Sequence, residues 1–311
     1  MNIKEKLKII QDVSGLTQTE IAAKIGVSFV AFNNWWNEKS LPRKKQQVLI
    51  DDLYKEYSGQ NDIPETILAA KKELIAMESK KYKNILDVIL KNSDIFDQFL
   101  LSLTYNSNKI EGSTLSEDET ADIIFNNKSI PNKSVIEHLE VKNHQAALRY
   151  LFNYLKDAKK INEELILKLH GILMNGIRDD AGSYRRHGVR IVGSNVPTAN
   201  FLKVPVLMKD ITKDINKKQK DKVGHVSNIH SRFEQIHPFS DGNGRIGRLI
   251  LTAMLLMGNI APLIIRQEEK RIYYTCLRRA QLKGDFTQLE DFICNAIMIG
   301  FGILIRKYPR I

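Results

Sequence analysis

The sequence predicts a mainly α-helical protein that carries one short β-hairpin. Two residue pairs, Ser116 with Glu119 and Thr17 with Glu20, have the spacing of a capping box, in which side chain and backbone bond reciprocally at the start of a helix. Only residues 189–192 are rich in β-branched side chains next to a turn, which is typical of a hairpin strand. The clearest helical run repeats apolar residues at intervals of three and four, at Ile246, Leu249, Ile250, Ala253, Leu256 and Met257.

The length of 311 residues and a hydrophobic content of 43% allow about two domains with a sizeable core. We expect residues 1–60 to form a small N-terminal domain, residues 61–95 a linking helix and residues 96–311 the main domain. The polar, turn-prone stretch 57–62 separates the first two parts, and Pro64 suits the first turn of the linking helix.

The N-terminal domain has the outline of a helix-turn-helix. A helix that starts at Thr17 meets a stop at Gly26, and Ser28 starts a second helix that continues to Trp36. The pattern resembles the lambda-repressor-like class, in which the second helix enters the major groove, so that DNA contact would run through residues 16–42. The resemblance places four residues at the bases, Ser28, Phe29, Asn33 and Asn34.

Charge gives this DNA interpretation little support. Residues 1–60 hold 9 Lys and Arg against 7 Asp and Glu, a net of +2 out of +11 for the chain. Trp36 and Glu38 also depart from the class, which usually has Glu and Gly at these places. A helical cap that packs on the main domain, or on a second copy, is an equally open interpretation.

Residues 237–248 combine a base, a carboxylate, an amide, three glycines and two guanidiniums within twelve positions. Glycines on both sides of the amide allow a turn whose N–H groups point at an anion, and the following helix adds its positive N-terminus. Arg245 and Arg248 lie three apart, hence on one helix face, and suit phosphate oxygens. Asp241 suits Mg²⁺, and His237 suits a base that removes a proton from a hydroxyl. The segment therefore predicts a site for a nucleoside triphosphate.

The same segment matches, without a departure, the pattern His-Pro-Phe-x-Asp/Glu-Gly-Asn-Gly-Arg-x-x-Arg, and so resembles the signature of the Fic family. The resemblance implies a helical Fic fold and transfer of AMP from Mg·ATP to a Ser, Thr or Tyr hydroxyl of a protein, with release of pyrophosphate. The chain would then be a protein adenylyltransferase whose partner is a protein substrate.

The resemblance also implies a role for each signature residue. His237 would be the general base and Asp241 the Mg²⁺ ligand. Arg245 would bind the inner phosphates and Arg248 the γ-phosphate of ATP, while Phe239 anchors the loop from the core. The anion hole around the α- and β-phosphates would be formed by Gly242, Asn243, which also uses its side chain, and Gly244.

A second motif lies upstream, on a helix expected near residues 100–112. Ser107 and Glu111 are four apart and share a helix face, and Gly112 is the residue type that most often ends a helix. Beside the Fic signature, this segment resembles the family's inhibitory motif, Ser/Thr-x-x-x-Glu-Gly/Asn. The resemblance implies that Glu111 pairs with Arg248 and blocks the γ-phosphate position. Whether Glu111 only inhibits or also supports removal of AMP stays open.

The predicted hairpin joins residues 189–192 to residues 201–204 through a turn at 193–195. A small structural ribbon is one interpretation of it. By resemblance it is the flap against which the target segment lies as an added strand. Downstream, Tyr274 lies in a helical pattern of mostly core residues and is expected to reach the adenine or ribose.

Two cysteines without metal-ligand spacing, Cys276 and Cys294, lie in apolar helical patterns and are expected to be buried thiols, as suits a reducing cytoplasm. The first residues lack the apolar run of a signal peptide, and nowhere do 18 apolar residues follow one another. We therefore expect a soluble, cytoplasmic protein without a membrane partner.

Three alternatives to AMP transfer stay open. The same fold could remove AMP or transfer another phosphate-containing group. The chain could instead be a DNA-binding regulator whose nucleotide site senses ATP, or act in a toxin-like role controlled by Glu111. Self-modification and a homodimer also stay open.

Overall fold

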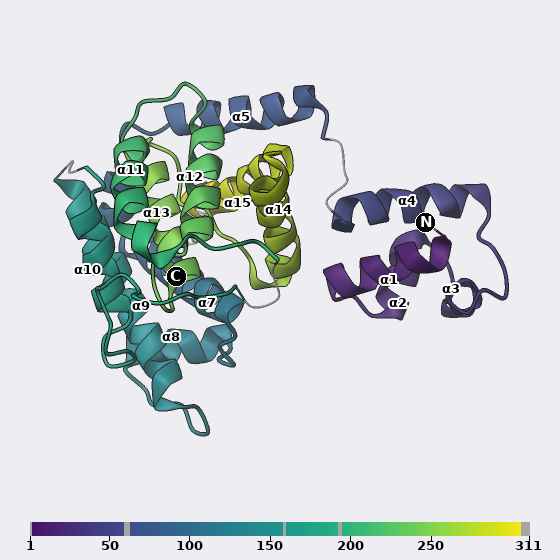
Figure 1. Cartoon of the computed structure of the whole chain (residues 1–311), viewed down its shortest axis with the longest axis horizontal. Helices are drawn as coiled ribbons and strands as arrows, with labels where there is room; N and C mark the ends of the chain where they lie inside the picture. Colours follow the sequence, from purple (N-terminus) through teal and green to yellow (C-terminus); the bar gives the residue numbers. More distant parts are fainter. Residues whose placement is uncertain (1, 59–62, 158–159, 192–194, 306–311) are drawn as a thin grey trace.

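The computed structural model describes residues 2–58, 63–157, 160–191 and 195–305, and every regular element within these ranges is helical. The mainly α-helical class predicted from the sequence is confirmed. Figure 1 shows helices α1 to α4 gathered on one side of the molecule and α5 to α15 on the other.

The first four helices form a unit with its own core. Asn2 and Thr17 each complete a capping box with the Glu three residues later, and Gly26 ends the second helix in the left-handed conformation at φ 73°. The helices are α1 (Ile3–Ser14), α2 (Gln18–Ile25), α3 (Phe29–Trp36) and α4 (Lys44–Ser58). The buried residues of their core are Leu7, Ile10, Ile21, Ala22, Ile25, Phe32, Trp35, Ile50, Tyr54 and Tyr57. The two helices expected after Thr17 and Ser28 are therefore present, and DNA binding stays a prediction.

The larger unit is built around a second, continuous core that runs from Leu68 to Leu304. Its first helices are α5 (Glu65–Lys80), α6 (Ile85–Lys91), α7 (Ser93–Glu111), α8 (Glu117–Asn126), α9 (Val135–Lys156) and α10 (Glu163–Leu173). They are followed by the short 3₁₀ helix η1 (Phe201–Lys203), α11 (Val204–Ile215), α12 (Lys222–Ile236), α13 (Asn243–Met257), η2 (Gln267–Glu269), α14 (Lys270–Lys283) and α15 (Thr287–Ile305). The stretch expected to be one linking helix thus holds α5 and α6, and both contribute to the large core through Ile75 and Ile89.

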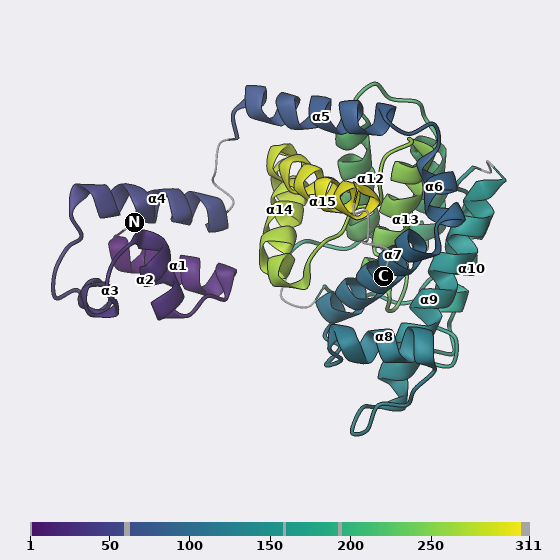
Figure 2. The same ribbon diagram turned by 180° about the vertical axis from the view of Figure 1, so that it is seen from behind.

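Helix α13 is the central element of the larger unit. Helices α7, α9, α10 and α12 all pack against it (Figure 2), which explains why nearly every residue from Arg245 to Leu256 is buried. This burial requires the apolar repeat seen in the sequence. It also means that the N-terminal end of α13 is held in place by four other helices.

The predicted hairpin differs from the structure. Its second arm is not a strand, because η1 and the start of α11 occupy residues 201–204. The Asn200 side chain accepts a hydrogen bond from Leu202 N at 3.0 Å and so caps a helical turn where we expected a strand. The first arm has no strand in its described part, residues 189–191, and the expected tip at 192–194 lies outside the described residues. The first arm is instead contacted by Thr198, which precedes the expected second arm and whose Oγ1 donates to Val189 O at 2.7 Å.

The two units touch through α1 and α14. Gly15 ends α1, and the Arg271 guanidinium donates to the carbonyl of Asp12 at 2.5 Å, where the last carbonyls of a helix lack partners. Ile272 packs against the N-terminal core. Lys270, which directly precedes Arg271, lines the cleft described below.

Helix α15 is long and apolar enough to cross a membrane by length and composition, with a mean hydropathy of 1.5. In this fold 61% of that stretch is buried, and α15 packs against α5, α12 and α14. It therefore serves here as a core helix.

Candidate active site

The site is a cleft of about 570 Å³ at the N-terminal end of α13. Its walls come from the loop that joins α12 to α13, from the end of α7 and from one side of α14. The lining includes His237, Asp241, Gly242, Asn243, Gly244, Glu111 and Tyr274. The structure thus brings the signature loop, Glu111 and Tyr274 into one cavity, although they are far apart in the sequence.

The loop between α12 and α13 turns through two left-handed residues. His237 (φ 51°) ends α12 and Gly242 (φ 76°) precedes α13. Gly244 is different, because it lies within the helix, where the absence of a side chain leaves room for the Glu111 carboxylate. A Cβ at Gly244 would lie 2.5 Å from Glu111 Oε1. The expectation that both glycines supply the turn is therefore right for Gly242 and wrong for Gly244.

Asn243 braces this loop from inside. Its side-chain Oδ1 accepts from Phe239 N and its Nδ2 donates to Phe239 O, both at 2.9 Å. Phe239 is fully buried, as expected, and stacks on the His170 ring with centroids 3.8 Å apart. The Asn243 amide is thus bonded to the backbone in this structure, and its contact with phosphate stays a prediction. The turn is therefore rigid before a ligand arrives.

Arg185 fixes the loop from the other side. It is buried, and its guanidinium donates to the carbonyls of His237 at 2.7 Å and Ala199 at 2.5 Å. Its backbone N–H donates to Pro238 O at 3.0 Å. Sequence analysis missed Arg185, because an arginine just before the expected hairpin has no local pattern that marks it.

His237 has the geometry of a base. Its Nδ1 lies 3.2 Å from Glu234 O, and since a carbonyl can only accept, Nδ1 carries the proton in the neutral ring. The Nε2 lone pair is then free to accept a proton. Burial lowers the pKa of His237, partly offset by the Glu234 carbonyl, so the imidazole is neutral at pH 7.

Arg248 is held by both residues of the upstream motif. Its Nη2 donates to Glu111 Oε1 at 2.7 Å and to Ser107 O at 3.1 Å, and its Nε donates to Ser107 Oγ at 2.9 Å. Burial is the largest single influence and raises the pKa of Glu111, but the charge and hydrogen bond of Arg248, together with the charges of Arg245 and Lys270, lower it more, so the net shift is downward. The buried Arg248 is therefore paired with Glu111, whose side chain is 31% exposed, as the family resemblance led us to expect.

Arg245 and Asp241 lie on the other side of the turn. Arg245 Nη1 donates to Glu140 Oε1 of α9 at 2.7 Å, whereas its Nη2 is 3.8 Å from Asp241 Oδ1. Asp241 accepts a hydrogen bond from Gly242 N at 2.6 Å. Glu140 was not predicted, since only the packing of α9 on α13 brings it near.

The residues fit a magnesium ion only in part. Asp241 is a single carboxylate, 54% exposed at the mouth of the cleft, and Mg²⁺ with a nucleotide needs one or two carboxylates plus phosphate oxygens. Among the described residues no group of three or more His, Cys, Asp or Glu side chains forms a metal site. Any bound Mg²⁺ would therefore depend on the nucleotide for most of its ligands.

Glu234 is a further residue that sequence analysis missed. It lines the cleft one turn before His237, is 6% exposed, and its Oε1 has no hydrogen-bond partner among the described residues. Burial raises its pKa to about 8, so it is protonated at neutral pH. Gly247 makes room for it, because a Cβ there would overlap the Glu234 carboxyl.

Comparison with known proteins decides the family. Residues 160–255, which hold the whole loop and most of α13, match the family model described as the Fic/DOC family. The chain contains a Fic domain. The matched segment lies between Glu111 and Tyr274 in the sequence and includes neither of them.

Curated relatives share this Fic domain. Proteins named "Protein adenylyltransferase Fic" from Aedes aegypti and Nematostella vectensis are each 31% identical, over 196 and 203 residues, or 61% of this chain. The matched parts are 39% and 45% of those proteins, so the chain corresponds to less than half of the relatives' length.

Solved structures support the Fic fold over a longer stretch. A Fic-1 structure (residues 134–508) from C. elegans superposes with a TM-score of 0.67 at 21% identity, covering 96% of each chain. A Fic family protein from Desulfovibrio desulfuricans G20 gives a TM-score of 0.64 at 25% identity, over 78% of this chain and 74% of that one. The helices around the Fic segment therefore belong to the same fold.

Proposed function

We propose that this protein is a protein adenylyltransferase that transfers AMP from ATP to a Ser, Thr or Tyr hydroxyl of a protein, and that Glu111 holds it in an inhibited state. The names of the curated relatives support the reaction. The observation that carries the inhibition is the Arg248–Glu111 contact at 2.7 Å beside His237 in one cleft.

The reaction follows from the cleft's chemistry. The target hydroxyl gives its proton to His237 Nε2, and its oxygen forms a bond to the α-phosphorus of ATP. The bond from that phosphorus to the bridging oxygen breaks, and pyrophosphate leaves with the electron pair. The N–H groups at the start of α13, with Arg245, stabilise the negative charge on the inner phosphates. Mg²⁺ held by Asp241 would offset further phosphate charge when bound.

Inhibition would follow because the Glu111 carboxylate and the γ-phosphate of ATP need the same guanidinium, that of Arg248. Arg248 is directed at Glu111 and Ser107, and a γ-phosphate that needs the same N–H groups must first displace them. ATP that binds without this contact is misaligned for in-line attack. The same Glu111 could instead orient a water for removal of AMP, which remains the principal alternative.

We also propose roles for the three parts of the chain. Residues 1–60 would be a helix-turn-helix module that binds DNA, residues 61–95 a connecting part and residues 96–311 the catalytic domain. At the start of α3, Phe29 and Val30 are exposed and open to a ligand, whereas the amide of Asn33 bonds Asn37 at 2.8 Å. A gel shift of the whole protein on specific and random duplexes, at two salt concentrations, tests DNA binding.

The activity is tested by intact-mass analysis after incubation with Mg·ATP and a cell extract of potential targets. Glu111→Gly is expected to add AMP to a protein, wild type to add less, and Glu111→Gly with His237→Ala to add none. Equal labelling by wild type and Glu111→Gly would refute the inhibition. An adduct of another mass would assign a different phosphate-containing group, and loss of AMP from a modified target would favour hydrolysis.

Cytoplasmic location is also proposed, on the basis of the two free cysteines. Cys276 and Cys294 are buried and unpaired. Burial raises the pKa of each thiol to about 12, so both are unreactive.

A further inference from the structure

Two carboxylates compete for Arg245. Glu140, from α9, accepts from Nη1 at 2.7 Å, and Asp241, four residues before Arg245 in the chain, lies 3.8 Å from Nη2. Arg245 itself is only 3% exposed, so its charge requires a close partner. In this structure the partner is Glu140.

The competition has a physical reason to favour Glu140. Asp241 lies just before Gly242, the N-cap of α13, and its Oδ1 is already 3.8 Å from Arg245 Nη2, so the two would pair more closely if nothing else held the guanidinium. The Glu140 side chain is 19% exposed against 54% for Asp241, and water screens the more exposed pair more strongly. Glu140 therefore satisfies Arg245 and leaves most of the Asp241 carboxylate free.

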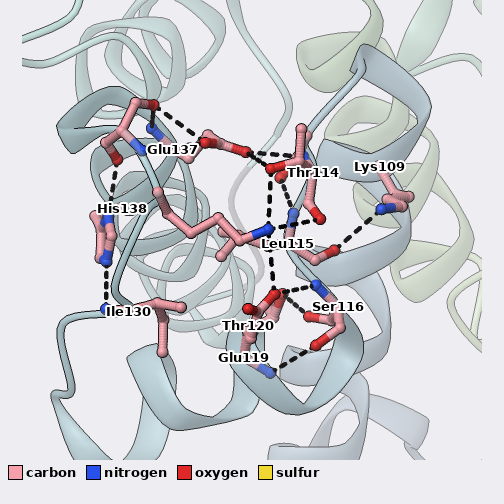
Figure 3. Close-up of polar contacts among 12 residues, drawn as sticks. Lys109, Thr114, Leu115, Ser116, Glu119, Thr120, Ile130, Glu137 and His138 are labelled. Carbon is pink, nitrogen blue, oxygen red and sulfur yellow. Dashed lines mark hydrogen bonds and ion pairs between the residues drawn. The ribbon is translucent and has the colours of Figure 1, made fainter.

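Helix α9 fixes the place of Glu140. One turn earlier, Glu137 accepts from Thr114 N at 2.8 Å and Thr114 Oγ1 at 2.7 Å, as Figure 3 shows. One turn later, Asn143 Nδ2 donates to Leu173 O at 3.1 Å and Asn175 O at 2.8 Å. The register of α9 against its neighbours is thus set on both sides of Glu140.

We infer that Glu140 is a positioning residue: it takes the close contact with Arg245 at 2.7 Å, limits Asp241 to a long contact of 3.8 Å, and so keeps the Asp241 carboxylate available to the divalent cation that accompanies the nucleotide. The inference rests on the proposed function only for the identity of the ligand, Mg·ATP. Glu140 of α9 would then influence metal binding through Arg245 and Asp241, without itself being a metal ligand.

The test measures nucleotide binding, not turnover. Calorimetry of ATP binding is done with Mg²⁺ and with EDTA, in a Glu111→Gly, His237→Ala background that frees Arg248 and consumes no ATP. Glu140→Gln is expected to reduce the gain in ATP affinity that Mg²⁺ provides by about tenfold or more. Binding in EDTA is expected to change little, because Arg245 stays near the phosphates.

Asp291→Asn is the matched control. It breaks an ion pair of similar length whose carboxylate is similarly exposed, Lys71 to Asp291 at 2.6 Å with the carboxylate 17% exposed, between α5 and α15 and outside the cleft. The Mg²⁺ gain should be unaltered in this variant. An equal loss in Asp291→Asn and Glu140→Gln would show that any lost ion pair has this effect, and would overturn the inference.

A cycle with Asp241→Asn separates positioning from general damage. If Glu140 acts through Asp241, Glu140→Gln causes no further loss of the Mg²⁺ gain once Asp241 is replaced. Independent, additive losses, or an unchanged gain in Glu140→Gln alone, contradict the inference. If the background protein binds Mg·ATP but Glu111→Gly transfers no AMP, the proposed activity fails and the cycle still decides the role of Glu140.

Discussion

Gly244 lies directly beneath the carboxylate of Glu111, with 2.5 Å between Glu111 Oε1 and the position that a Cβ would occupy. The contact between Glu111 and Arg248 therefore depends on the absence of a side chain at Gly244 as well as on charge. Arg248 Nη1 lies 3.1 Å from the same position, so the glycine serves both members of the ion pair.

Gly244→Ala is expected to push Glu111 off Arg248. In the wild-type background this should lower stability by about 1–3 kcal/mol through overpacking. In the Glu111→Gly background the clash with Glu111 is absent, the Arg248 guanidinium at 3.1 Å can shift because it has lost that partner, and Ala in a helix is favoured over Gly by up to about 1 kcal/mol. Chemical denaturation of the four proteins checks the change of sign. The same destabilisation in both backgrounds would mean that Glu111 is not what Gly244 accommodates.

Ser107→Ala is expected to weaken inhibition without abolishing it. The substitution removes the acceptor of Arg248 Nε at 2.9 Å but leaves Glu111 in place. A hydrogen bond to a charged group contributes about 1.5–3 kcal/mol, so AMP transfer at limiting ATP should rise roughly tenfold, less than in Glu111→Gly. Ser102→Ala, on the same helix, should leave the rate as it is, because the Ser102 carbonyl that accepts from Asn106 is kept and the bond to Arg248 Nε is made by Ser107. A lower rate in Ser107→Ala would count against a role in inhibition.

Glu234 is expected to make stability depend on pH. Its pKa is raised to about 8 in the folded protein from an ordinary value of 4.5, so the folded state binds a proton that the unfolded state has released. Stability from this group is therefore complete below pH 4.5 and is lost as pH rises through about 8. Melting temperatures from pH 5 to 9 should fall less steeply for Glu234→Gln than for wild type. Parallel curves would show that Glu234 is not the titrating group.

Glu137→Ala is expected to loosen the segment that follows the inhibitory helix. Glu137 accepts from both the backbone and the hydroxyl of Thr114, and these bonds, backbone first, lower its pKa to about 2. The sign is opposite to that of Glu234: its stabilisation is present above pH 4.5 and is lost as pH falls through about 2. The variant should melt a few degrees lower at pH 7 and transfer AMP faster, as thermal scans and labelling measure. An unchanged rate of AMP transfer would show that the contact between Glu137 and Thr114 does not affect the position of Glu111.

The sequence was most informative where the site is contiguous. The loop from His237 to Arg248 was predicted residue by residue, because its chemistry lies within twelve positions. The contact of Glu111 with Arg248 was expected only through the family resemblance. Nothing local indicates it.

Side chains that bond to backbone are hard to foresee from sequence. Both ends of the Asn243 amide bond Phe239, a bracing role that its assignment to phosphate did not include. Asn200 starts a helical turn where β-branched neighbours suggested a strand. Glu140 and Glu234 were missed, because their place in the site depends on which helices pack beside α13, and no sequence period encodes that choice.

The bracing of the α12–α13 loop by Asn243 and Arg185 has one more consequence. The loop that would bind the nucleotide in our proposal is already braced in this structure. Glu111, the proposed inhibitor, lies in the final turn of α7, just before the left-handed Gly112. Release then demands no refolding of the catalytic scaffold. A partner that unwinds or tilts that single turn would open the enzyme, and its departure would close it again.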